Sequence, residues 1–209
     1  MQIEKKENKR LFTYGDYVNW PDDERWEIID GVPYDMTPAP NRLHQEISGN
    51  LFNQIRNFLE DKSCKVYDAP FDVRLPDKNE KDEDVLTVVQ PDIVVVCDQE
   101  KLDDKGCRGS PDLAIEIISP FTSRKDQMEK FELYERHNVK EYWIVHPDGR
   151  FVSVYILTDG KYPTPKQYSE EDKLPVNVLP GLEINLAKVF PFHPKVVKES
   201  PRPYTAGNK

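Results

Sequence analysis

The sequence has few cysteines and no long apolar run. Three cysteines, Cys64, Cys97 and Cys107, occur among 209 residues, and none stands in a CxxC pair. An odd number without that spacing argues against zinc and predicts free thiols in a reducing compartment rather than disulfides. The longest apolar stretches, such as 93–97 and 113–118, are far shorter than the roughly 20 residues of a membrane-spanning helix. We therefore expect no membrane span and a cytoplasmic location.

Several motifs of hydrolases and nucleotide-binding proteins are also missing. The sequence contains no G-x-S-x-G elbow, no G-x-x-x-x-G-K-[ST] phosphate loop and no G-x-G-x-x-G dinucleotide fingerprint. These absences argue against a serine hydrolase and against nucleotide binding by either route. The first residues carry basic side chains with no apolar segment behind them, which argues against a secretory signal.

Positive charge is scarce in the part of the chain that we expect to fold. Lys and Arg number 29 against 38 Asp and Glu, which gives a net charge of -9. The expected flexible tails, 1–10 and 193–209, carry +2 and +3, so subtracting them leaves -14 on the single expected domain, 11–192. An acidic body disfavours binding to phosphate-rich nucleic acid, which basic patches drive. Carboxylates can also serve as metal ligands, so the acidity has a second interpretation.

Apolar periodicity and turn residues predict an α/β fold. The expected elements are a short helix at 11–20, a hairpin at 26–36 around Asp30-Gly31, a helix at 41–61, strands at 65–75, 93–97 and 113–118, a helix at 122–137, a strand at 141–145, a hairpin at 151–168 around Asp159-Gly160, and a helical turn at 186–190. Asp-Gly between two such runs is typical of a type I′ hairpin turn. The order predicts a central mixed sheet flanked by helices, with added β-hairpins.

Two Pro-Asp pairs precede expected strands, and Glu116 lies within the second of these strands. Asp112 and Glu116 are about 13 Å apart along one strand, too far to share a metal ion. Asp92 and Glu116 can converge on one divalent cation if their strands are neighbours about 4.8 Å apart. An ionised carboxylate in a central strand is costly unless it is paired or coordinated. The alternative is that Glu116 pairs with a lysine or faces solvent at a sheet end.

Other candidate residues have less specific patterns. Lys130 and Tyr134 follow Asp126 at four-residue steps on one helix face, and spacing alone favours a solvent-facing lysine. Ser123-x-x-Asp126 fits a helix capping box, which favours a capping role for Asp126. His44 falls in the first turn of the earlier helix, a position typical of a packed or capping histidine, and Glu27 is either a surface acid or a further ligand.

Six segments occur in an order that carries a family resemblance. They are Trp26-Glu-Ile-Ile-Asp-Gly31, Thr37-Pro-Ala-Pro-x-x-x-His44, Pro91-Asp-Ile-Val-Val-Val96, Gly109-Ser-Pro-Asp-Leu-Ala-Ile-Glu-Ile-Ile-Ser-Pro120, Asp126-x-x-x-Lys130-x-x-x-Tyr134 and Val139-x-Glu-Tyr-Trp-Ile-Val145. Together they resemble the Uma-type putative restriction endonuclease family of the PD-(D/E)XK nuclease superfamily, over about residues 12–190. The resemblance implies a restriction-endonuclease-like core.

The resemblance also implies roles for these residues. Asp92 and Glu116 would hold Mg²⁺ (or Mn²⁺) beside a scissile phosphate, and a lysine would position or deprotonate the attacking water. The sequence departs from the superfamily pattern because Ile118 stands where that lysine is expected. The family pattern offers Lys130, on the following helix, as a migrated substitute. His44 would transfer a proton or support a ligand, and Glu27 would be an auxiliary acid.

The leading hypothesis is therefore a magnesium-dependent endonuclease that hydrolyses phosphodiester bonds of DNA in the cytoplasm, and it allows a homodimer. One alternative is a non-catalytic nucleic-acid-binding or RNA-directed member of the same fold. Another is a hydrolase of a small phosphoester, which the acidic body would suit better than duplex DNA. A basic rim formed by Arg124, Lys125, Lys130 and the two tails would favour duplex DNA.

Overall fold

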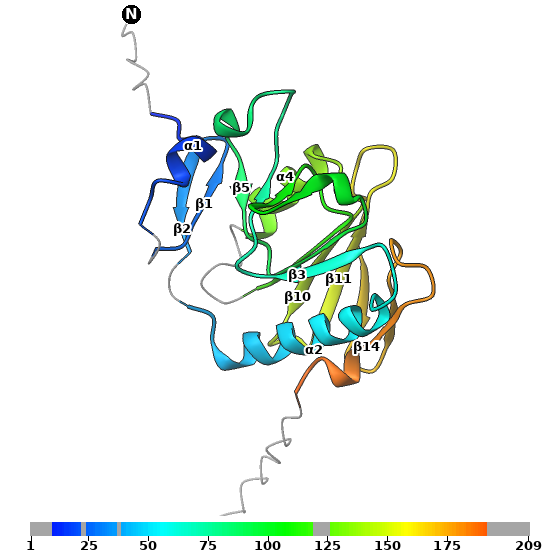
Figure 1. Ribbon diagram of the computed structural model, residues 1–209. Helices are drawn as coiled ribbons and strands as arrows, with labels where there is room; N and C mark the ends of the chain where they lie inside the picture. Colours follow the sequence, from blue (N-terminus) through cyan, green and yellow to red (C-terminus); the bar gives the residue numbers. More distant parts are fainter. Residues whose placement is uncertain (1–9, 22–23, 37–38, 119–125, 192–209) are drawn as a thin grey trace, which may run out of the picture.

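The computed structural model of the protein describes residues 10–21, 24–36, 39–118 and 126–191 (Figure 1). Residues 1–9 and 193–209 of the expected tails lie outside these ranges, as do residue 192, Arg124, Lys125 and the Ser123 end of the expected capping box. Within the described ranges, no helix is long and apolar enough to cross a membrane. The mixed α/β architecture that we expect from the sequence is confirmed.

The central layer is a mixed sheet of six strands, in the order β12-β11-β10-β9-β6-β3. Its strands are β3 (Lys65–Asp68), β6 (Ile93–Val96), β9 (Leu113–Ile117), β10 (Glu141–His146), β11 (Phe151–Ile156) and β12 (Lys166–Ser169). β9 and β10 pair in parallel, whereas the other neighbours pair antiparallel. The inner strands are buried on both faces, which explains their nearly continuous apolar runs.

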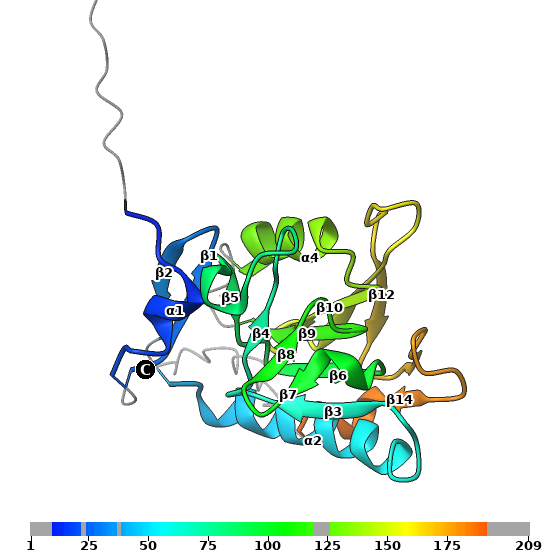
Figure 2. The same cartoon turned by 45° about the horizontal axis from the view of Figure 1, so that its top comes forward.

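Helix α2 (Arg42–Phe58) covers one face of this sheet (Figures 1 and 2). The side chain of Asn41 accepts the backbone N–H of His44 and so caps the helix, as the sequence predicts. Ile47, Leu51 and Ile55 recur on the buried side of the helix and are fully buried in the core beneath the sheet. The hairpin of β13 (Lys173–Pro175) and β14 (Glu183–Asn185) closes the same core.

A second six-stranded sheet lies toward the other face of the central sheet, and the sequence did not predict it. Its order is β2 (Val32–Asp35), β1 (Trp26–Ile29), β5 (Val88–Val89), β4 (Val73–Arg74), β8 (Gly106–Arg108) and β7 (Leu102–Asp103). Four of these strands have only two or three residues, too few to show an alternating pattern. The apolar side chains of this sheet join α4 (Phe131–Arg136) and the upper face of the central sheet in a second core.

Three other expected elements differ from the structure. The expected strand at 65–75 divides at Pro70 between β3 and β4, which belong to different sheets; proline has no N–H to donate to a ladder. In the second hairpin, Asp159 and Gly160 take positive φ as expected, but β12 begins only at Lys166. The described part of the expected helix at 122–137 is a π-helical segment, η3 (Asp126–Lys130), followed by α4.

The remaining short helices fall close to loops and element ends. They are α1 (Tyr14–Tyr17), η1 (Asp82–Asp84), η2 (Gln99–Lys101) and η4 (Leu186–Lys188). The first and the last of them lie inside the helical segments expected at 11–20 and 186–190. The first hairpin turn is also as expected, because Asp30 and Gly31 have φ of 50° and 77°.

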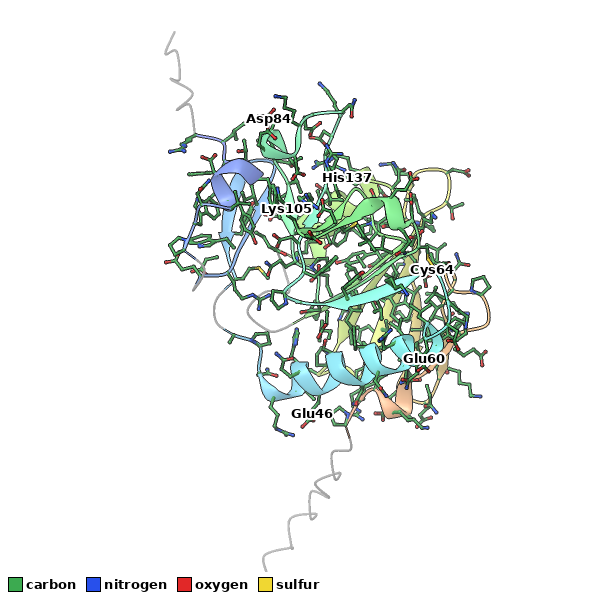
Figure 3. The ribbon with its side chains drawn as sticks, in the orientation of Figure 1. Glu46, Glu60, Cys64, Asp84, Lys105 and His137 are labelled. Atoms are coloured by element: carbon green, nitrogen blue, oxygen red, sulfur yellow. A yellow bond between two sulfur atoms is a disulfide. The ribbon has the colours of Figure 1, made fainter. Side chains whose placement is uncertain are left out.

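The expectation of free thiols is wrong for two of the three cysteines. Cys64, labelled in Figure 3, forms a disulfide with Cys97, while Cys107 is free and buried. Lys65 pairs with Val96 in the antiparallel ladder, so the two bonded cysteines occupy the next opposed position. They are 33 residues apart in sequence, and sequence spacing alone does not reveal which residues a sheet register will oppose.

His137, at the end of α4, gives stability a predictable pH dependence (Figure 3). Burial lowers its pKa, and Arg136 lowers it further, against the opposing charges of Asp77, Asp30 and Glu80. Because the unfolded state then binds a proton more readily, stability is present above the unfolded pKa and is lost as pH falls through the folded pKa. We expect the free energy of unfolding to decrease between about pH 7 and pH 5.

Urea denaturation of the wild-type protein and of His137→Gln at several pH values measures this effect. The variant should show a shallower decrease. A residual slope is expected from His146, whose pKa is also lowered by burial. An equal slope in both proteins would contradict the assignment to His137.

Candidate functional site

The register of β6 and β9 brings the two predicted acids to one place. Ile93 pairs with Ile115, and Val94 with Ala114. One further step along this antiparallel ladder places Asp92 opposite Glu116. Directly opposed residues share a face, with Cβ atoms about 4.5–5.5 Å apart. Both acids therefore lie at the end of the central sheet where β6 begins and β9 ends.

Asp92 is fixed by one donor on each oxygen. Its Oδ2 accepts the backbone N–H of Ile117 at 2.7 Å. Its Oδ1 lies 3.2 Å from Nε2 of His44, which the first turn of α2 carries toward the end of the sheet. The His44 side chain is largely buried, and its Nδ1 has no hydrogen-bond partner among the described residues. The structure thus places the side chain of His44 against Asp92. The backbone N–H of His44 is the group that the capping residue Asn41 accepts.

Lys130 reaches Glu116 from the end of the π-helical segment. Its Nζ lies 2.9 Å from Oε1 of Glu116, and the lysine is only 1% exposed. The solvent-facing position that spacing favours is therefore wrong, because the second sheet covers this side of the helix. Pairing of Glu116 with a lysine, one of the two structural alternatives, is observed. Ile118 packs against the second core, and the ammonium group enters beside Glu116 from another element.

Glu27 joins the same cluster from β1. Its Oε1 lies 2.9 Å from Nζ of Lys130 and accepts the backbone N–H of Gln90 at 2.8 Å. The residue is 1% exposed, so its interpretation as a surface acid is wrong. Within the part of the chain that the structure describes, its Oε2 is buried and makes no hydrogen bond. Lys130 consequently bridges two buried carboxylates that are 89 positions apart in the chain.

Tyr134 contacts the site although sequence reasoning gave it no role. It lies one turn after Lys130 and is fully buried, and its hydroxyl donates to Oε1 of Glu116 at 2.7 Å. Burial and the charge of Glu116 raise its pKa well above the ordinary value, so the hydroxyl stays protonated as a donor. Its four-residue spacing from Lys130, which places both on one helix face, is the sequence signal that could have indicated this contact.

Asp112, the other acid that follows a proline, lies away from these residues. Its Oδ2 accepts the backbone N–H of Cys97 at 2.7 Å, and its Oδ1 lies 2.6 Å from Nζ of Lys140. This is the opposite end of the β6–β9 pair from Asp92. The expectation that Asp112 is too far from Glu116 to share its site agrees with this placement.

Carboxylates are the chemical type of ligand that a small hard cation takes. Two carboxylates, Glu116 and Glu27, contact the ammonium group of Lys130, and Asp92 lies across the β6–β9 pair from Glu116. Among the described residues, no group of three or more His, Cys, Asp and Glu side chains is arranged to hold a metal ion. Mg²⁺ is commonly held by one or two carboxylates and completes its shell with waters and substrate phosphate. A pair formed by Asp92 and Glu116 is compatible with that mode.

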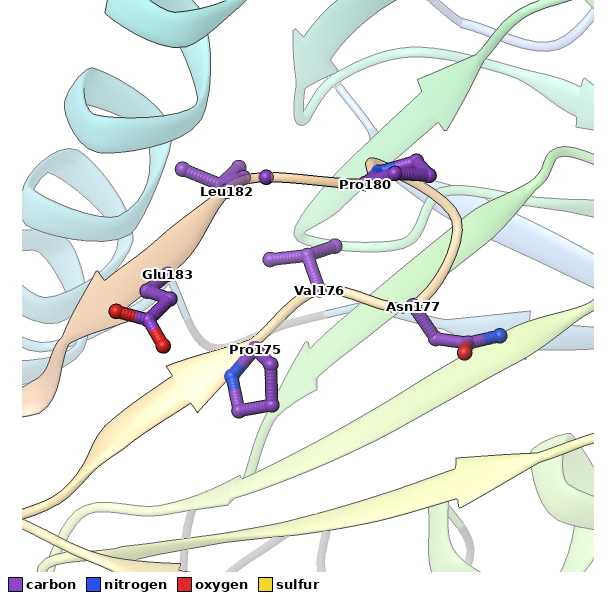
Figure 4. Close-up of a pocket in the computed structure, with 7 residues that line it drawn as sticks. Pro175, Val176, Asn177, Pro180, Leu182 and Glu183 are labelled. Atoms are coloured by element: carbon purple, nitrogen blue, oxygen red, sulfur yellow. The ribbon is translucent and has the colours of Figure 1, made fainter.

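A large hollow elsewhere on the surface does not coincide with the cluster. It measures about 770 Å³ and lies in the loop between β13 and β14 (Figure 4). Glu183 is the one charged residue among the seven that line it, and the remaining residues are Pro175, Val176, Asn177, Pro180, Gly181 and Leu182. None of the acids Asp92, Glu116 and Glu27 lines this hollow. The hollow therefore does not indicate a reaction site at the β13–β14 loop.

Comparison with known proteins agrees with the resemblance seen in the sequence. The sequence model of the family described as "Uma2: Putative restriction endonuclease" matches residues 14–187. This match covers all five predicted site residues. The chain belongs to the Uma2 family. The family assignment made from the six sequence segments is therefore confirmed.

Two relatives of this Uma2 protein are informative. "Uncharacterized protein slr1290" of Synechocystis sp. is 24% identical over 163 residues, which cover 76% of this chain and 81% of the relative. A crystal structure of a "putative nuclease belonging to DUF820" from Anabaena variabilis superimposes with a TM-score of 0.68 and 18% identity. The superposition covers 86% of this chain and 97% of the other. The protein thus shares the fold of that nuclease-like structure, and its family indicates a nuclease.

Proposed function

We propose that the protein is a metal-dependent endonuclease that hydrolyses phosphodiester bonds of DNA, with Asp92 and Glu116 as ligands of Mg²⁺ or Mn²⁺. The observation that carries the proposal is the β6–β9 register, which opposes these two acids on one sheet face. Membership of the Uma2 family and the nuclease-like fold support the reaction class. A cytoplasmic location and a homodimer stay predictions.

The bound cation would lower the pKa of a coordinated water and neutralise charge that develops on the phosphate oxygens. The protein supplies the orientation of its ligands. The Ile117 N–H and His44 hold Asp92, while Lys130 and Tyr134 hold Glu116. Such supporting contacts fix ligand orientation and commonly change metal affinity by about 10–100-fold.

Lys130 and Glu27 act as a pair in this proposal. The Lys130 ammonium offsets the mutual repulsion of Glu27 and Glu116, so the Glu116 carboxylate can remain charged in a buried place. Glu27 in turn is held by the Gln90 N–H. His44 lies 3.2 Å from Asp92, and its imidazole is the kind of side chain that general acid–base chemistry uses.

The test compares Asp92→Asn with Asp112→Asn in a DNA cleavage assay. Both carboxylates follow a proline, stand before a central strand and accept one backbone N–H at 2.7 Å, but only Asp92 faces Glu116. We expect cleavage of plasmid or single-stranded DNA with Mg²⁺, and complete loss of cleavage with EDTA. Asp92→Asn should reduce the rate by at least about 10³-fold, whereas Asp112→Asn should stay within about threefold of wild type.

Other outcomes distinguish the alternative functions. Cleavage that persists in Asp92→Asn would refute the site. Nucleic-acid binding that survives the substitution, with no cleavage by wild type, would indicate a binding module. Hydrolysis of RNA or of a model phosphodiester, with DNA left intact, would indicate a different substrate class.

A further inference from the structure

Arg25 is a half-buried arginine that lies directly before strand β1. Its Nη2 donates to Oε1 of Gln90 at 3.0 Å, and its Nε makes a longer contact of 3.4 Å with the same oxygen. Within the described ranges Arg25 forms no ion pair with Asp or Glu, whereas every other described arginine except Arg56 does. The partner of Arg25 is thus a neutral amide, which leaves its positive charge without a paired carboxylate.

The side chain of Gln90 holds Arg25 in a fixed orientation. Gln90 is buried, and its Nε2 donates to Oδ1 of Asp72 at 2.9 Å and to the hydroxyl of Tyr17 at 3.1 Å. These two contacts use both N–H groups of the amide, so its oxygen is directed at the guanidinium. The Nε–Nη2 edge of Arg25 is therefore held by the protein.

Strands β1 and β5, which lie side by side, place Arg25 next to the acid cluster (Figure 1). The backbone N–H of Gln90 donates to Oε1 of Glu27 at 2.8 Å, so the residue that holds Arg25 also holds an acid of the cluster. Gln90 precedes Asp92 by two residues, a span of at most about 7 Å between Cα atoms. The guanidinium consequently lies at the border of the proposed site.

We propose that Arg25 binds a backbone phosphate of the nucleic-acid substrate through the paired N–H groups of Nη1 and Nη2. This inference rests on the proposed function, because it takes the nucleic acid as the ligand. Gln90 engages Nε and one N–H of Nη2, so three of the five N–H groups of a guanidinium are left by this contact. Two parallel N–H groups match two oxygens of a phosphate. Contacts of this kind position a strand and do not read its sequence.

An acidic chain needs a local positive charge where it binds phosphate. Lys130, one of the basic residues expected at the rim of the site, does not supply it. Its ammonium group lies between Glu27 and Glu116, and the lysine is only 1% exposed. Arg25 is reached by solvent and has no carboxylate partner among the described residues, so it can take the role that the rim lysine does not.

The test is the salt dependence of binding of a labelled single-stranded DNA oligonucleotide. Fluorescence anisotropy is measured in EDTA, so that the DNA is not cut. In Arg25→Gln the slope of log K against log[NaCl] should become shallower by about 0.7, the size of one phosphate contact on a single strand. The Kd at low salt should rise about tenfold, as expected for a hydrogen bond to a charged group. Arg25→Lys should keep the slope but raise the Kd about threefold, because an ammonium group lacks the paired N–H groups.

Arg56→Gln is the matched control. Arg56 is an exposed arginine in the last turn of α2, also without an ion pair among the described residues, and is about 18 Å along the helix from His44. Its variant loses the same charge and should keep the slope and the Kd of wild type. An unchanged slope in Arg25→Gln, or an equal change in Arg56→Gln, would overturn the inference.

Two further measurements complete the test. Circular dichroism checks that each variant folds, and if Arg25→Gln does not, Arg25→Lys decides, because an unchanged Kd in that variant would overturn the inference. Cleavage by wild type with Mg²⁺ tests the proposed function separately. The expected slopes without any cleavage would overturn the proposed function alone, whereas cleavage together with a wild-type slope in Arg25→Gln would overturn the inference alone.

Discussion

Replacement of Lys130 by methionine should cost about 3–5 kcal/mol of the free energy of unfolding and abolish cleavage. The expected size is that of removing one partner from a buried ion pair. Nζ of Lys130 lies 2.9 Å from both Glu27 and Glu116, and all three residues are at least 96% buried. Without the ammonium group, two like charges face each other where water cannot solvate them. Urea denaturation and the DNA cleavage assay measure the two effects.

Two further variants isolate the electrostatic cause. Lys140→Met removes the Lys140–Asp112 ion pair, but because Lys140 is 67% exposed and solvent screens it, the loss should stay below about 1 kcal/mol. Lys130→Met combined with Glu27→Gln removes one of the two opposed charges and should be more stable than Lys130→Met alone. If Lys130→Met has the same free energy of unfolding as wild type, the explanation from buried charge is contradicted.

Replacement of Gly106 by alanine should destabilise the second sheet by about 4 kcal/mol or more, a size confined to substitutions that disrupt packed structure. Gly106 has φ of 124°, and a Cβ there would lie 2.3 Å from the carbonyl oxygen of Asp72. That carbonyl accepts the N–H of Cys107, so β8 must move away from it. The Asp72 side chain accepts the amide of Gln90, whose backbone N–H holds Glu27. We therefore expect weaker cleavage as well as lower stability.

Gly160→Ala separates steric clash from backbone strain. Gly160 also has positive φ, 76°, but nothing lies within 4 Å of a Cβ placed there. Its cost should be that of backbone strain alone, about 1–2 kcal/mol. Chemical denaturation of both variants gives the comparison. If Gly106→Ala and Gly160→Ala lose similar amounts of the free energy of unfolding, β8 can shift at little cost, which would contradict the expectation for Gly106.

The parts of the fold that the sequence predicts are those encoded over several consecutive residues. Helix α2 has a capping residue and four turns of apolar periodicity, and the first hairpin has an Asp-Gly turn. The central strands have long apolar runs because both of their faces are buried. The second sheet is different, since most of its strands are too short for alternation to appear. Its existence depends on pairing between distant segments, such as β4 with β8.

The site shows the same division. Asp92 and Glu116 could be identified because each has a local context that demands an explanation: a Pro-Asp step, and a charge in an apolar strand. Spacing did not predict the burial of Lys130 and Glu27, because the elements that cover them come from another part of the chain. The disulfide between Cys64 and Cys97 was missed for the same reason, since it depends on strand register.

The two Pro-Asp carboxylates also protect the alignment of the site against misfolding. Asp92 and Asp112 each accept an N–H from the opposite strand where β6–β9 pairing ends, one at each end. A slip of one residue would remove both bonds and turn apolar side chains to the wrong faces. A chain with the misaligned strands would thus be less stable, and Asp92 would no longer lie opposite Glu116. Refolding that restores the core should therefore restore the alignment of this acid pair with it.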